Sequence, residues 1–168
     1  MDLGVREGAR IALAALRDAH AAHETARAIE KGVSLIAARE HARAEIERKL
    51  EQRGFSAAST ELALSRLEEY GYLDDARFAE TYIRERLRRH PEGRMALAAG
   101  LAKRGVAPPV AARVLDEVVN EEVELDALER AARKLASDGR GPDKLAVALL
   151  RRGFPPAAVR GWIRDHEI

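Results

Sequence analysis

The feature that most constrains the fold of this chain is a short motif that occurs three times. The segments IERKLEQRGF, LAAGLAKRGV and LAVALLRRGF place apolar residues at matching positions before Gly54, Gly105 and Gly153, and these glycines are spaced 51 and 48 residues apart. Repetition at such a period indicates successive copies of one structural unit, none of which buries its apolar face alone. The sequence therefore predicts an array of similar units.

Each copy of the motif predicts a helix that ends at its glycine. Glycine enters the left-handed conformation at a helix C-terminus without the Cβ penalty of other residues. The next residue then packs back on the helix, which pairs Phe55 with Leu50, Val106 with Leu101, and Phe154 with Leu149. A second helix follows each glycine, because Ser and Pro residues supply start signals there and apolar residues recur at the i, i+3, i+4, i+7 spacing of one buried face.

Residues 70–79, YGYLDDARFA, predict a helix stop joined directly to a helix start. Gly71 ends one helix, Tyr72 is expected to fold back on that helix, and Asp74 caps the next helix with Leu73 and Phe78 in the two staple positions. Four of the seven aromatic residues lie here or one turn further on. We expect their rings to anchor a tight three-helix unit.

These patterns predict an all-α fold of tandem three-helix repeats that form an elongated, curved helical array with an extra N-terminal helical segment. The expected divisions are an N-terminal helical extension at 1–40, a first repeat at 41–90, a second at 91–138 and a truncated third at 139–168. The extension is predicted to be one or two amphipathic helices, with a split near residues 32–34. A hydrophobic fraction of 46% with only 4% aromatic residues fits Ala- and Leu-based helix packing.

Composition excludes several classes of protein. The chain has 168 residues and no cysteine, which removes disulfides, thiol nucleophiles and thiolate metal sites, and the cytoplasm is the expected location. No apolar run reaches the length of a membrane span, so we expect a soluble protein with no membrane partner. Charged residues make up 34% of the chain but leave a net charge of +1. Most of these charges are expected on solvated helix faces, although 24 arginines among 29 cations favour an acidic or polyanionic partner.

The candidates for catalysis or metal binding have simpler structural interpretations. Asp74 and Asp75 diverge in direction at a helix start, where capping accounts for Asp74. His20 and His23 share a helix face, but two ligands without a third make a weak metal site. No G-x-x-x-x-G-K-[ST] phosphate loop occurs. We therefore expect no catalytic residue, metal or cofactor, and a protein that is not an enzyme.

Arginine clusters are the candidate partner-binding residues. One cluster lies at a predicted helix end, where cations complement the helix dipole but four exceed that need. Another gives residues 141–168 a local charge of +2. If they face one groove, they suit phosphates or an acidic protein surface. The candidates are Arg84, Arg86, Arg88, Arg89, Arg151, Arg152, Arg160 and Arg164.

Together these motifs resemble the RecX family, the bacterial regulators of the RecA recombinase. The matching pieces are AREHARAEIERKLEQRGF at 38–55, LEEYGYLDDARFAETYIRER at 67–86, LAKRGV at 101–106 and a weaker LRRGF near the C-terminus. The most specific element is the stretch at 71–79. The family's structural motif falls on Gly54, Phe55, Gly71, Tyr72, Leu73, Asp74, Asp75, Phe78 and Ala79.

The resemblance implies a non-enzymatic modulator, mainly an inhibitor, that binds the RecA filament along its groove. It would suppress ATP hydrolysis, strand exchange and coprotease function, and so act in homologous recombination, DNA repair and the SOS response. Single- or double-stranded DNA is a further candidate partner, and a monomer without cofactor is expected. Two alternatives remain open: a general DNA-binding protein that affects recombination by coating DNA, and a scaffold that dimerises through Ala-rich faces.

Two departures from the family pattern carry expectations of their own. The family commonly has Ser in an R-E-H-S-R string where this chain has Ala42, so a helix cap is lost and the preceding helix is expected to run through. Residues 1–33 also look longer than usual and are expected to form an added helix.

Overall fold

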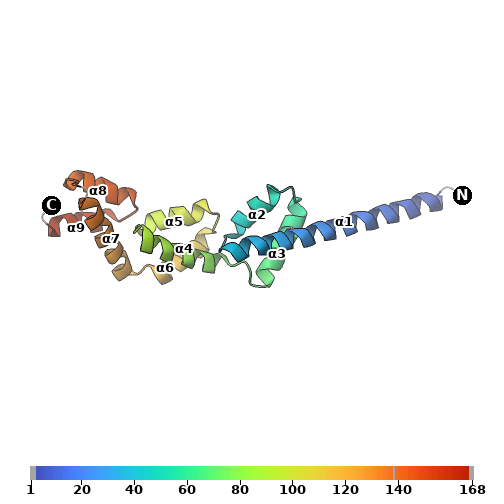
Figure 1. Cartoon of the computed structure of the whole chain (residues 1–168), viewed down its shortest axis with the longest axis horizontal. Helices are drawn as coiled ribbons and strands as arrows, with labels where there is room; N and C mark the ends of the chain where they lie inside the picture. The colour runs from blue at the N-terminus through green and yellow to red at the C-terminus, as the bar shows by residue number, and fades with distance from the viewer. Residues whose placement is uncertain (1–2, 138, 167–168) are drawn as a thin grey trace. The chain divides into compact units, whose positions relative to one another are not determined.

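The computed structural model describes the backbone of residues 3–137 and 139–166, with side chains from residue 10 onward. Within these ranges the chain is helical and forms no strand (Figure 1). The all-α prediction is therefore confirmed. The helices are α1 (Leu3–Ala38), α2 (Arg43–Glu51), α3 (Ala57–Glu69), α4 (Asp75–Arg89), α5 (Arg94–Lys103), α6 (Pro108–Val118), α7 (Glu121–Ala136), α8 (Pro142–Arg151) and α9 (Pro156–Asp165).

The chain divides into two compact units, Met1–Asp74 and Asp75–Ile168. In the first unit, α1 packs on α2 and α3, which also pack on each other. Its core is aliphatic, with Ile46 and Leu50 from α2 and Leu64 and Leu67 from α3 all fully buried. Ala28 contributes the small residue that lets α1 approach this core.

The second unit contains two groups of three helices. In one group α4, α5 and α6 pack on one another, and in the other α7, α8 and α9 do so. Backbone hydrogen bonds join the groups, since the Gly93 N–H donates to the Arg152 carbonyl at 2.8 Å and the Met95 N–H donates to the Gly153 carbonyl at 3.4 Å. The Arg94 N–H also donates a hydrogen bond to Glu124 Oε1, at 3.1 Å.

The predicted tandem three-helix repeats are confirmed, and their phase is set by packing. The repeated motif marks α2, α5 and α8, which are the second helices of the three groups. The expected segments 41–90 and 91–138 begin at those second helices, one helix later than the packing groups begin. A repeat in sequence fixes the length of a unit but not the helix at which it starts. With this phase the third group has three helices.

The glycine joints have the predicted geometry. Gly54, Gly105 and Gly153 have φ of +83°, +85° and +82°. The N–H that follows each glycine donates back into the preceding helix, from Phe55 to the Leu50 carbonyl at 3.3 Å and equivalently in the other two joints. The chain therefore reverses at each glycine as the sequence predicts.

Residues 70–79 are a helix stop joined to a helix start, but the roles of the aromatic residues differ from those predicted. Gly71 has φ +70°, and the Leu67 carbonyl accepts hydrogen bonds from the N–H groups of Tyr72 and Leu73. The buried side chain is that of Leu73, whereas Tyr72 is 48% exposed and Tyr70 is 66% exposed. Tyr72 folds back on the helix through its backbone N–H, as predicted, but the side chain that fills the core is that of Leu73.

The other two aromatic residues of this region do anchor packing. Phe78 is buried, and its ring is stacked against that of the half-buried Tyr82, with centroids 6.3 Å apart. Tyr82 lies against Gly100 of α5, where a Cβ would meet the tyrosine hydroxyl, and the Arg104 guanidinium lies 4.4 Å from the Tyr82 ring centroid. The ring thus joins α4 to α5 through a glycine gap and a cation–π contact.

The N-terminal segment is one continuous helix, so the alternative with a split near residues 32–34 is wrong. Gly32 lies inside α1 and is buried. A Cβ built there would lie 2.5 Å from Leu67 Cδ1. This glycine therefore allows α1 and α3 to approach closely and does not break the helix.

The expectation that α1 runs through Ala42 is also wrong. Helix α1 ends at Ala38, and Ala42 has an extended backbone with no side-chain cap bond to α2. Both His41 and Ala42 are buried, and His41 Nδ1 lies 2.8 Å from Glu45 Oε2. Burial of this link and the His41–Glu45 pair hold the turn that the family's serine would otherwise cap. The same burial lowers the pKa of His41.

One carboxylate joins α1 to the start of α3. Glu24 accepts hydrogen bonds from the Ser56 N–H at 2.8 Å and from the hydroxyls of Ser56 and Ser59 at 2.7 Å each. Ser56 also caps α3 by accepting from the Ser59 N–H. The bonds from Ser56 and then Ser59 lower the pKa of Glu24 from 4.5 to about 2.

Candidate functional site

The described residues offer no metal centre. No three His, Asp or Glu side chains among them converge in a way that could hold a metal ion. His20 and His23 are exposed on α1. Asp74 directly precedes α4, and Asp75 is its first residue, where a carboxylate is favoured by the helix dipole.

None of the described helices is both long enough and apolar enough to cross a bilayer.

On α4, the two outer arginines of the first cluster have intrahelical partners. Arg84 Nη2 lies 2.8 Å from Glu80 Oε1, and Arg89 Nη2 lies 3.0 Å from Glu85 Oε1. These pairs are exposed, so each contributes little to stability and leaves its guanidinium available for exchange with another anion. Arg88 is exposed and has no ion pair within the described part of the chain.

Arg86 is held more firmly than its neighbours. Its guanidinium makes a two-pronged contact with the Glu92 carboxylate, with Nε to Oε2 at 3.0 Å and a second bond from Nη2 to Oε1. Bonding to Glu92 raises the pKa of Arg86, although partial burial opposes this. The pair ties the end of α4 to the 90–93 loop, which gives Arg86 a structural role.

A pocket of about 300 Å³ brings the two predicted clusters together at one point. It lies within the second unit, where the end of α8 meets the loop after α4, and the Gly93–Arg152 backbone bond holds this approach. Arg86 comes from the first cluster and Arg152 from the second. The lining residues are Arg86, His90, Pro91, Glu92, Lys134 and Arg152.

Lys134 of α7 is a basic residue of this pocket that sequence reasoning missed. It lies in the last turn of α7, where a cation is common because it complements the helix dipole. Its position in the sequence therefore did not mark it as a binding residue. Only the packing of α7 against α8 brings it beside Arg152.

The remaining arginines of the second cluster do not line this pocket. Arg151 is exposed at the end of α8, and Arg160 and Arg164 are exposed on α9. Arg164 Nε lies 3.2 Å from its neighbour Asp165, while Arg151 and Arg160 have no ion pair among the described residues. The structure therefore places Arg86 and Arg152 at one pocket, which the other candidates do not line.

Two family models match the chain. The model described as "RecX, first three-helix domain" matches residues 28–67, and the one described as "RecX, second three-helix domain" matches residues 74–115. These ranges fall on the C-terminal part of α1 with α2 and α3, and on α4 with α5 and most of α6. The models therefore divide the chain as the helix packing does.

Curated relatives and solved structures give the same result. The chain is 35% identical to Regulatory protein RecX of Chlorobaculum tepidum, with 82% of this chain and 86% of the relative covered. It is 36% identical to Regulatory protein RecX of Halorhodospira halophila, with 86% and 90% covered. The crystal structure of RecX from Lactobacillus salivarius matches its fold with a TM-score of 0.76 at 19% identity, covering 86% of this chain and 97% of that one.

Proposed function

Because the chain belongs to the RecX family of regulatory proteins, we propose that it modulates the RecA recombinase, mainly as an inhibitor, by binding the RecA nucleoprotein filament. In this proposal it suppresses the filament's ATPase, strand exchange and coprotease activities without catalysing a reaction itself. The observation that carries the proposal is the match to proteins named Regulatory protein RecX over more than four fifths of the chain.

The two-unit architecture supports a mechanism based on many modest contacts. A filament presents the same surface repeatedly, and units joined in one chain can contact more than one copy of it. Once one unit is bound, the other meets its site at a high effective concentration, so weak individual contacts add to a useful affinity. Binding that favours one filament conformation also resists the transitions that ATP turnover requires.

The exposed arginines of the second unit are the proposed contacts to the filament. Arg88, Arg151 and Arg160 are the strongest candidates, because each is exposed and has no ion pair among the described residues. Arg84, Arg89 and Arg164 would first exchange an exposed carboxylate partner. Arg86 and Arg152 face a shared pocket, and Arg86 is already held by Glu92.

The proposal places the protein in the bacterial cytoplasm, where RecA filaments form, and it requires only a monomer. It also connects the protein to homologous recombination, DNA repair and the SOS response through RecA. Contacts to single- or double-stranded DNA within the filament would be electrostatic and sensitive to salt.

The test is the DNA-dependent ATPase of preformed cognate RecA filaments, titrated with this protein. Affinity for the same DNA without RecA is measured in parallel. Inhibition at concentrations well below those that coat bare DNA supports the filament as the target. Inhibition that appears only when DNA is saturated would replace the proposal with DNA coating, and no inhibition would refute an inhibitory role.

A further inference from the structure

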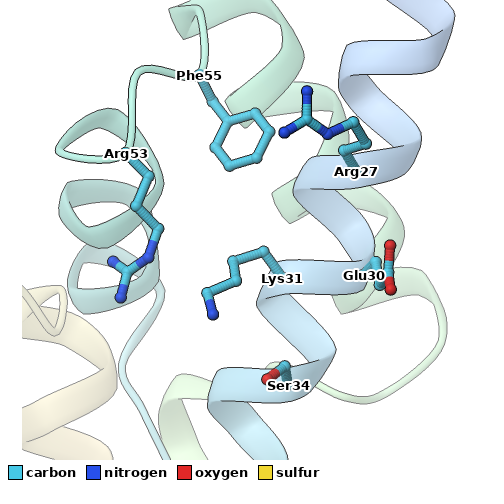
Figure 2. Close-up of a pocket in the computed structure, with 6 residues that line it drawn as sticks. All are labelled: Arg27, Glu30, Lys31, Ser34, Arg53 and Phe55. Carbon is cyan, nitrogen blue, oxygen red and sulfur yellow. The ribbon is translucent and has the colours of Figure 1, made fainter.

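A second basic pocket lies in the first unit, far in sequence from the predicted clusters. It has a volume of about 380 Å³ and is formed by α1 together with the joint between α2 and α3 (Figure 2). Three of its lining residues are cations, namely Arg27, Lys31 and Arg53. None of the three belongs to the clusters that the sequence singled out.

Regular helix geometry and one glycine bring these cations together. Arg27, Lys31 and Ser34 are spaced i, i+4, i+7 along α1, so they lie on one face of that helix. Gly54, with φ +83°, turns the chain after α2, and the residues on either side of it, Arg53 and Phe55, line the pocket together with that face. Figure 2 shows the Lys31 ammonium and the Arg53 guanidinium directed into the space between the elements.

The cations of this pocket have no counter-ion in the part of the chain that the structure describes. Elsewhere in the same unit Arg43 bonds both oxygens of Glu61, at 2.7 and 2.8 Å. In contrast, Arg27, Lys31 and Arg53 have no ion pair among the described residues, and Arg53 donates only to the Lys49 carbonyl. The one carboxylate at the rim, Glu30, is directed away from Lys31 and Arg53 in Figure 2. Converging like charges repel, and a bound anion would relieve that repulsion.

An aromatic ring completes the pocket. Phe55 is half-buried and packs with one part on the core of the unit, while its ring also lines the pocket. The Arg27 guanidinium lies 5.9 Å from the ring centroid. A ring beside several cations matches a ligand that carries phosphate next to a flat base, since nucleic-acid sites combine charge with base–aromatic stacking.

We propose that this pocket binds the phosphate of a nucleotide unit, with the phosphate between Lys31 and Arg53 and the base beside Phe55 and Arg27. Three converging cations suit a phosphate group better than a single carboxylate, which one arginine already satisfies. The phosphate can come from a single-stranded nucleic acid or from a free nucleotide. The site is a property of this chain alone, so it does not depend on the proposed action on RecA.

The experiment measures binding of a fluorescently labelled single-stranded oligothymidylate to the full chain, without RecA, by anisotropy. ATP, inorganic pyrophosphate and a glutamate-rich peptide serve as unlabelled competitors. The pocket variant Lys31→Gln/Arg53→Gln is compared with Arg48→Gln/Arg66→Gln, which removes two positive charges from the same unit outside the pocket.

The pocket variant is expected to bind at least about tenfold more weakly, and the control less than about twofold more weakly. Competition by ATP assigns the site to a free nucleotide, whereas binding of the strand without such competition assigns it to nucleic acid. Equal losses in both double variants, or no binding of any phosphate probe, would overturn the proposal. Displacement by the acidic peptide alone would replace it with a protein partner.

A third variant separates the role of the ring from that of the charges. Phe55→Leu keeps an apolar side chain against the core but removes the flat face. It is expected to weaken binding of the oligothymidylate about fivefold while leaving pyrophosphate binding within about twofold of the unsubstituted chain. An equal effect on both probes would contradict the placement of the base.

Discussion

At the scale of single residues, substitutions at two glycines with positive φ have different costs. One would introduce only backbone strain, and the other would also introduce a steric clash. Gly71 and Gly153 both occupy the left-handed region, with φ of +70° and +82°. A Cβ at Gly71 would meet nothing within 4 Å, whereas one at Gly153 would lie 2.3 Å from the backbone nitrogen of Ala96. The same substitution at the two positions therefore tests different physical costs.

We expect Gly71→Ala to lower the free energy of unfolding by about 1–2 kcal/mol, the cost of the left-handed conformation alone. Gly71→Val should cost at least as much, because a β-branched side chain is less tolerant of positive φ. Gly153→Ala should cost clearly more than Gly71→Ala, since backbone must move to admit the new carbon. Urea denaturation followed by circular dichroism measures both values.

Asparagine provides the control for this comparison, because it tolerates the left-handed region better than alanine. Gly71→Asn should recover part of the lost stability, and Gly153→Asn should not. Equal losses for the two alanine variants would show that no steric conflict exists at Gly153.

Glu24 gives the first unit a specific sensitivity to acid. Its pKa is lowered from 4.5 to about 2 by bonds from Ser56 and then Ser59, so the folded state prefers the ionised carboxylate. This contribution to stability is fully present above pH 4.5 and is lost as the pH falls towards 2. Glu24→Gln should therefore destabilise the protein at pH 7, and the gap to the unsubstituted chain should narrow below pH 4.5.

The measurement is the difference in unfolding free energy between the two proteins at several pH values, which cancels the titration of other groups such as His41. A gap that stays constant down to pH 2.5 would mean that the carboxylate is not held by these hydrogen bonds.

At the scale of elements, the contact between α1 and α3 depends on the absence of a side chain at Gly32. A Cβ there would lie 2.5 Å from Leu67 Cδ1, and Leu67 is fully buried among core residues, so its side chain has little room to move. The missing side chain at Gly32 therefore lets α1 lie this close to α3. The exposed residues 10–23 of α1 make no comparable contact with the core.

Gly32→Ala tests this close approach, because its effect on stability should change sign when Leu67 is made smaller. An alanine raises helix propensity by about 1 kcal/mol, but overpacking against Leu67 is expected to cost more, so the net effect is destabilising. In a Leu67→Ala background, itself destabilised by about 2–5 kcal/mol, the same change should become stabilising because space is available. A thermal-melt cycle of the four proteins that shows simple additivity would contradict direct contact between the two positions.

At the scale of the whole molecule, positive and negative charges are nearly equal in number, so the arginines that lack an ion pair are the ones available to an anionic partner. The chain carries 29 cations and 28 anions, and several described arginines on helix faces, such as Arg84, Arg113 and Arg130, pair with a carboxylate one turn away. Unpaired, exposed arginines are therefore the positions where a partner's anions gain most. Among the described residues of the second unit, Arg88, Arg151 and Arg160 are exposed and have no ion pair.

We expect the triple change Arg88→Gln, Arg151→Gln and Arg160→Gln to raise the concentration needed for half-inhibition of the RecA ATPase by about tenfold or more. The matched control replaces three arginines of the same unit that have carboxylate partners one turn away, Arg113, Arg130 and Arg133, with glutamine. The control should shift half-inhibition by less than about threefold. Equal shifts would indicate that net charge, and not these three positions, determines binding to the filament.

The sequence by itself determined the helices, their glycine joints and the family. Each of these depends on local chemistry, such as a glycine at positive φ or apolar residues at helical spacing, and local chemistry is written in consecutive residues. The tertiary structure decided which helices group together, that Gly32 is a point of close approach and that Tyr70 and Tyr72 remain largely exposed. It alone brought Lys134 beside Arg152 and gathered Arg27, Lys31 and Arg53, because contacts between residues distant in the chain depend on packing that no local pattern encodes.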